Sequence, residues 1–138
     1  MKSIRKNGNK KKEEDVLYWI KLSDYDIDTA EAMLRTGRYV YVLFCCQQAV
    51  EKLLKSIVVK VMNIFPPKSH DLIRLADLAK VGLSDEQGLF FEKLTNYYIE
   101  TRYPEEMKEL SQKVTKELAI RYFKETQEAL KCLNQLLK

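Results

Sequence analysis

The sequence predicts an all-helical protein, and three observations support this fold class. Glycine and proline are scarce, with four Gly and three Pro in 138 residues, so they leave a few long uninterrupted segments. Within those segments apolar residues recur at steps of three and four, which places them on one face of a helix. The connections between segments are short. We therefore expect an antiparallel four-helix up-and-down bundle with an additional short helix.

The first two predicted helices are long. One runs from about residue 13 to 35 and ends before Gly37, a residue that favours the left-handed backbone found after many helices. The other runs from about residue 38 to 62. Its first half is apolar on almost every face, which is typical of a buried central helix. Pro66 and Pro67 follow it and prevent its continuation.

The remaining helices are predicted from their start and stop signals. Ser69 is the expected N-cap of a short third helix. Ser84, with Gln87 three residues later, matches the capping box that begins a fourth helix. Pro104 disfavours helical backbone at the preceding residue, so it should interrupt that helix. The last helix is expected from about Ser111.

The charge is distributed unevenly along the chain. The net charge is +4, but residues 1–12 contain six basic residues and no acidic one, so the remainder is slightly acidic. We expect residues 1–12 to form a flexible basic arm and residues 13–138 to form one helical domain. The arm is either a frayed terminus or a contact for nucleic acid or another acidic surface.

Several functional classes are disfavoured by what the sequence lacks. There is no secretory signal, and the longest apolar run, Tyr39 to Cys46, is too short to span a bilayer. Of the three cysteines, Cys45 and Cys46 are neighbours, so free thiols in a cytoplasmic protein are expected. A single histidine, adjacent cysteines and the absence of a Gly-rich phosphate loop predict no metal site and no cofactor.

A polar stripe interrupts the apolar second helix. Its members occur at helical spacing and are Gln47, Gln48, Glu51, Lys52 and Lys55. One interpretation is the solvent face of an amphipathic helix. The other is a polar groove, whose amides and ammonium groups would meet a phosphate, a base edge or a partner protein.

Two further segments carry candidate functional residues. His70 lies at a helix start, where a neutral imidazole is favoured. It would act either as a general base or as a capping and hydrogen-bonding residue. Arg102 is flanked by tyrosines and followed by Pro104 after one residue. Its guanidinium suits a phosphate or carboxylate, or alternatively the terminal carbonyls of its own helix.

These segments together resemble a HEPN domain (higher eukaryotes and prokaryotes nucleotide-binding). The resemblance covers roughly residues 13 to 138 and rests on motifs that occur in the same order and at similar spacing. They are Trp19, Ser23, Asp26-Ile27, Ala30, Leu34, Gly37-Arg38-Tyr39, Phe44, Gln47-Gln48-Ala49-Val50-Glu51-Lys52-Leu53-Leu54-Lys55, Ser69-His70-Asp71-Leu72 and Arg102-Tyr103-Pro104.

The resemblance implies a helical bundle that is usually homodimeric. In prokaryotes, many such domains pair with a minimal nucleotidyltransferase as toxin and antitoxin. Active members are metal-independent ribonucleases that use an Arg, four to six residues, then a His, with two protomers forming one cleft. In this chain the eligible positions after Arg102 are Met107, Lys108 and Glu109, so the ribonuclease motif is absent.

The predicted function is therefore a HEPN-like module that binds a nucleotide or RNA and does not cut it. It would be homodimeric and a candidate partner of a minimal nucleotidyltransferase. The alternative is a divergent metal-independent ribonuclease that uses Arg102 and His70. The predicted ligand-binding residues are Gln48, Glu51, Lys52, Lys55, His70, Asp71, Arg102 and Tyr103.

Overall fold

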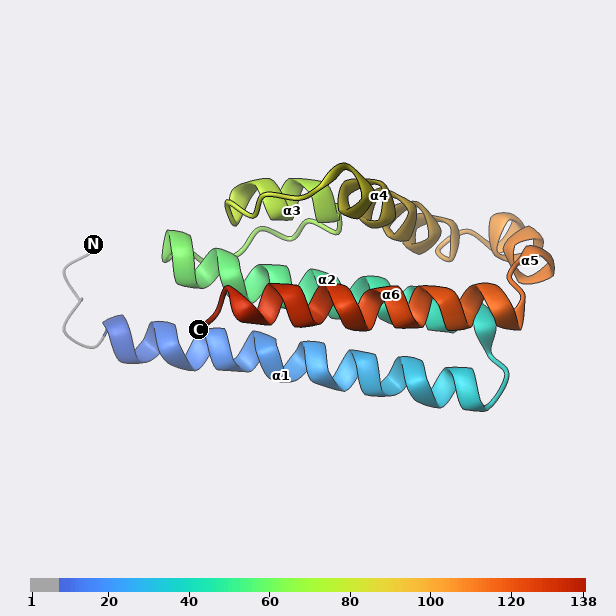
Figure 1. Cartoon of the computed structure of the whole chain (residues 1–138), viewed down its shortest axis with the longest axis horizontal. Helices are drawn as coiled ribbons and strands as arrows, with labels where there is room; N and C mark the ends of the chain where they lie inside the picture. Colours follow the sequence, from blue (N-terminus) through green and yellow to red (C-terminus); the bar gives the residue numbers. More distant parts are fainter. Residues whose placement is uncertain (1–7) are drawn as a thin grey trace.

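The computed structural model describes residues 8–138, and over this range the chain forms six α-helices and no strand (Figure 1). This confirms the predicted all-helical fold class. The helices are α1 (Gly8–Arg35), α2 (Tyr39–Met62), α3 (Leu72–Leu78), α4 (Asp85–Glu100), α5 (Pro104–Lys113) and α6 (Lys116–Gln135). Helix α1 begins five residues before the predicted start, so residues 8–12 of the expected arm are helical. Residues 1–7 lie outside the described range.

Helix α2 lies at the centre of the bundle. It packs against α1, α6, α4 and α3. The directions of α1, α2, α4 and α6 alternate along the chain (Figure 1). Sixteen residues of α2 are buried, so the prediction of a central helix is confirmed. Burying one Val or Leu side chain contributes roughly 1.5–3 kcal/mol. Helix α2 is therefore the element around which the other helices are held.

The predicted helix boundaries are confirmed at two places. Gly37 follows α1 with φ 78°, in the left-handed region where glycine is favoured. Ser84 and Gln87 form the capping box at the start of α4, each side chain bonding the other residue's backbone N–H. Helix α2 ends with Asn63 in the left-handed conformation, three residues before Pro66.

Two predicted boundaries are wrong. Asp71, and not Ser69, is the N-cap of α3, because its carboxylate accepts hydrogen bonds from the N–H groups of Ile73 and Arg74. The predicted interruption before Pro104 is confirmed, but Pro104 also begins a separate helix, α5, because proline is well suited to the first position of a helix.

The last helix consequently starts after Thr115, whose side chain caps α6, and not near Ser111.

Over the described residues, no helix is long and apolar enough to cross a membrane. The three thiols are free, as predicted. Cys45 and Cys46 are buried, and burial raises their pKa values to about 11 and about 12 respectively, while Cys132 is exposed.

Candidate functional site

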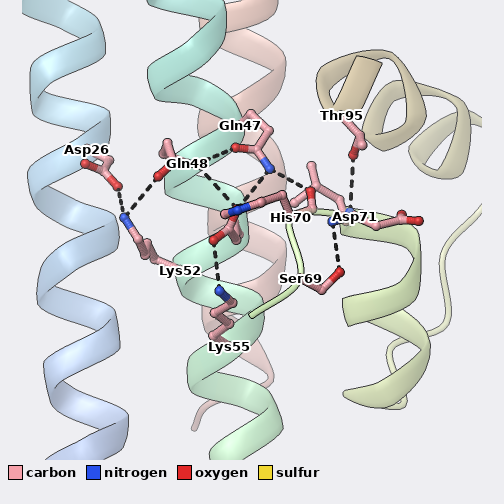
Figure 2. Close-up of polar contacts among 11 residues, drawn as sticks. Asp26, Gln47, Gln48, Lys52, Lys55, Ser69, His70, Asp71 and Thr95 are labelled. Atoms are coloured by element: carbon pink, nitrogen blue, oxygen red, sulfur yellow. Dashed lines mark hydrogen bonds and ion pairs between the residues drawn. The ribbon is translucent and has the colours of Figure 1, made fainter. Parts of the chain in front are cut away.

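The carboxylate of Glu51 is the centre of a buried polar network on α2. Figure 2 labels its partners Gln47, Lys55 and His70. The Glu51 side chain is only 2% exposed, yet donors surround both of its oxygens. Oε1 accepts from Gln47 Nε2 at 3.1 Å and from Gln48 Nε2 at 3.4 Å. Lys55 Nζ lies 2.9 Å from Oε2, and His70 Nδ1 lies 2.9 Å from Oε1. An ionised carboxylate has about four acceptor positions, and here three donors share Oε1 while Lys55 alone meets Oε2.

The network decides between the two interpretations of the polar stripe. Gln47, Glu51 and Lys55 are 0%, 2% and 6% exposed, so this part of the stripe is not a solvent face. The ammonium group of Lys55 also lies 5.5 Å from the ring centroid of Trp19 on α1. Burying a charge without partners is costly, and here each charge has one. These residues form a rigid internal support and are not open to direct contact with a ligand.

Two segments cover the stripe. On one side, the chain that precedes α3 passes along α2, and Gln47 Nε2 donates to the backbone carbonyl of His70 at 2.9 Å (Figure 2). On the other side α1 supplies Asp26, which pairs with Lys52 at 2.7 Å. Ser23 of α1 also donates to the carbonyl of Ala49 at 2.7 Å. The polar residues of α2 are therefore the means by which three segments are joined.

The ring of His70 connects this interior to solvent. Its side chain is 42% exposed, while Nδ1 faces the carboxylate of Glu51. An ionised carboxylate only accepts hydrogen bonds, so Nδ1 carries a proton and donates it. In the neutral ring, the lone pair then resides on Nε2. Glu51 thus fixes the tautomer of His70 in which Nδ1 is the donor and Nε2 is the acceptor.

Tyr98 of α4 brings the two candidate catalytic residues together. Its ring is 7% exposed and lies 4.9 Å from the ring of His70. The guanidinium carbon of Arg102 lies 5.8 Å from the same ring, and Phe44 stacks on it at 5.3 Å. Burial raises the pKa of Tyr98, while nearby Arg102 lowers it and Glu51 raises it further. His70 and Arg102, distant in sequence, therefore both lie against one ring.

Comparison with known proteins identifies the family and the fold. A family model described as the HEPN domain matches residues 16–137, which is nearly the whole chain. The chain belongs to the HEPN family. The crystal structure of TT1696 from Thermus thermophilus has a similar fold, with a TM-score of 0.73 and 23% identity. That similarity covers 87% of this chain and 96% of the other. No curated protein matches the chain.

The other predicted site residues of this HEPN chain lie outside the group formed by Glu51, His70 and Tyr98. Tyr103 is 56% exposed at the N-cap of α5. Asp71 is exposed, and its carboxylate is engaged in capping α3. Gln48 is half-buried and donates to Gln47 Oε1 at 2.7 Å. Lys52 is half-buried through its pair with Asp26, so its ammonium group already has a partner.

Sequence reasoning did not identify Tyr98 as a site residue. Aromatic residues occur along the whole of α4. Their spacing does not distinguish Tyr98, whose ring contacts His70 and Arg102, from the aromatic residues that only fill the core. A useful signal is its position: Tyr98 precedes Arg102 by four residues, the spacing at which two side chains would meet if the helix continued to Arg102.

Proposed function

We propose that this HEPN chain binds a nucleotide or RNA, with a phosphate of the ligand held by Arg102 beside His70. The observation that carries the proposal is that both side chains contact Tyr98 and both reach solvent. Within residues 8–138, Arg102 forms no ion pair. Its guanidinium is therefore available for the two parallel hydrogen bonds that suit a phosphate.

The buried residues have an indirect role in this proposal. Glu51 and Lys55 are too enclosed to touch a ligand, although both were predicted to do so. They support the position of His70 from within. Gln48 and Lys52 are half-buried beside them, and Tyr103 offers an exposed ring next to Arg102. The ligand-contacting set is then Arg102, His70 and Tyr103.

Replacing Arg102 with alanine should weaken binding of AMP or of a short RNA by about ten- to hundredfold, the loss expected for charged hydrogen bonds. Folding should be unaffected because the side chain is exposed. Arg121 is a matched control. It is also exposed, and its guanidinium carbon also lies 5.8 Å from a tyrosine ring, that of Tyr122.

Titration calorimetry on the two variants separates a site from a general effect of positive charge. Arg102→Ala should lose affinity, and Arg121→Ala should bind as the unmodified chain does. Equal affinities for all three proteins would count against the Arg102 site.

We further propose that the protein is a homodimer and pairs with a minimal nucleotidyltransferase, in a system of toxin–antitoxin type. Family membership supports this, as do two exposed aromatic rings, Tyr41 on α2 and Tyr103 beside Arg102, at 48% and 56% exposure. Exposed rings of this kind are enriched where proteins meet. The mass of the purified protein in solution tests the dimer, and purification from the native cell tests the partner.

The orientation of His70 favours a second candidate function, that of a divergent metal-independent ribonuclease. With Nδ1 bonded to Glu51, Nε2 is the atom that would accept the proton of a 2′-hydroxyl. The 2′-oxygen would attack the phosphorus and the P–O5′ bond would break, which gives a 2′,3′-cyclic phosphate and a 5′-oxygen that takes its proton from solvent. Arg102 would stabilise the charge on the phosphate oxygens.

Incubation with RNA in the presence of a chelator tests this second function. The ribonuclease hypothesis expects cleavage of RNA but not of the same DNA sequence, because DNA lacks the 2′-hydroxyl. It also expects His70→Ala to reduce the rate at least about a hundredfold, as removal of a general base does. Absence of cleavage in the unmodified protein leaves the binding function.

A further inference from the structure

An exposed aromatic cluster lies at the other end of the polar stripe. It consists of Tyr18, Trp19 and Phe65, and we call it the ring cluster. Trp19 is its half-buried centre, with Tyr18 at 5.9 Å and Phe65 at 6.5 Å between ring centroids, both in edge-on geometry. The two outer rings are 60% and 77% exposed. Edge-on packing fixes a ring in place while leaving its faces open, so the outer rings are held ready for a planar ligand.

Cationic side chains accompany these rings. Lys11 and Lys12 line a hollow of about 150 Å³ together with Trp19 and Phe65. Lys11 pairs with Asp15 in the same hollow, while Lys12 forms no ion pair within the described residues. Rings for bases beside lysines for phosphates are the combination that binds single-stranded nucleic acid. A purely apolar partner would form no favourable charge interaction with these lysines.

The ring cluster is connected to the candidate site by direct contacts. Trp19 meets the ammonium group of Lys55, Lys55 pairs with Glu51, and Glu51 holds His70. Glu51 and Lys55 are one helical turn apart, which is about 6 Å along α2. The ring cluster and the candidate site are therefore joined through Glu51 and Lys55 of α2, which form the link between Trp19 of α1 and His70.

We propose that the ring cluster is a second binding site, which stacks bases of a single-stranded RNA whose phosphate is held at Arg102. The inference rests on the proposed function and gives it a substrate class, a strand of several nucleotides and not a lone nucleotide. The site at Arg102 accepts AMP by itself, whereas only a longer strand reaches the rings.

The experiment uses the full chain and an oligouridine of about 12 nucleotides, a length within the range of single-strand binding sites. Trp19 is the only tryptophan of the chain, so its fluorescence reports directly on the cluster. Oligouridine should change this fluorescence saturably. Phe65→Ala should weaken oligouridine binding about tenfold, the usual loss for one stacked base, and leave AMP affinity unchanged.

Three control variants assign the cause. Phe65→Tyr keeps a ring and should bind as the unmodified chain does, while Phe65→Leu keeps an apolar side chain without a ring and should lose affinity. Leu89→Ala removes another exposed apolar residue, 52% exposed on α4, and should have no effect.

The outcomes separate the two proposals. If Phe65→Ala weakens oligouridine binding but the unmodified chain does not bind AMP, the ring cluster is supported as a binding site and the Arg102 site is rejected. If Arg102→Ala weakens AMP binding but Phe65→Ala does not change oligouridine affinity, the Arg102 site is supported and the ring cluster is rejected. A change in the protein's mass in solution on Phe65→Ala would show that the ring cluster is a protein contact and overturn the RNA proposal. Absence of binding to either probe rejects both.

Discussion

Glu51→Ala should lower the free energy of unfolding by about 3–5 kcal/mol, the loss typical when one partner of a buried ion pair is removed. Lys55 would remain 6% exposed without its counterion, and His70 Nδ1 and Gln47 Nε2 would lose the oxygen that they share. Urea denaturation of the variant and the unmodified chain measures the difference.

A second ion pair in the chain provides the control for burial. Lys11 and Asp15 have the same spacing of four residues and the same 2.9 Å distance as the pair of Glu51 and Lys55. Their side chains are 71% and 38% exposed, so water already solvates both charges. Asp15→Ala should therefore leave the free energy of unfolding nearly unchanged.

The double variant Glu51→Met with Lys55→Met tests whether the unpaired charge of Lys55 causes the loss of stability in Glu51→Ala. It removes both charges, so no uncompensated ion is left in the interior, and most of the stability lost in Glu51→Ala should return. If the single variant were as stable as the unmodified chain, the stripe would have to be hydrated. The support proposed for His70 would then fail.

The helices were predictable from the sequence because their signals are local. The apolar face of α1, the apolar first half of α2 and the capping box at Ser84 all act within one or two turns. The separate helix α5 was not predicted, because Pro104 was interpreted only as the residue that ends a helix. The same rigid φ and missing N–H that end one helix also suit the start of the next.

The burial of the site was not predictable in the same way. Helical spacing shows that Gln47, Glu51 and Lys55 share a face, but not what covers that face. The cover comes from the chain before α3 and from Trp19 of α1, both distant in sequence. For the same reason Arg102 and His70 could each be proposed separately, while their meeting at Tyr98 required the packing of α4 against α2.

Tyr98→Ala should have the largest combined effect on stability and binding. Its ring is 7% exposed and stacks on Phe44, so truncation should cost roughly 3–5 kcal/mol of unfolding free energy, as for other large aromatic residues in a core. It also removes the surface against which Arg102 and His70 rest. The loss of AMP affinity should therefore be about a hundredfold, the upper end of the range expected for Arg102→Ala alone.

Tyr122 on α6 separates the effect on the site from the effect on the core. It is 4% exposed and contacts two rings, Phe90 and Tyr97, at 5.3 and 5.6 Å. Tyr122→Ala should lose comparable stability and, well below its unfolding midpoint, retain AMP affinity. Tyr98→Phe keeps the ring and should retain both properties. Equal affinities in the two alanine variants would mean that Tyr98 stabilises the fold without organising the site.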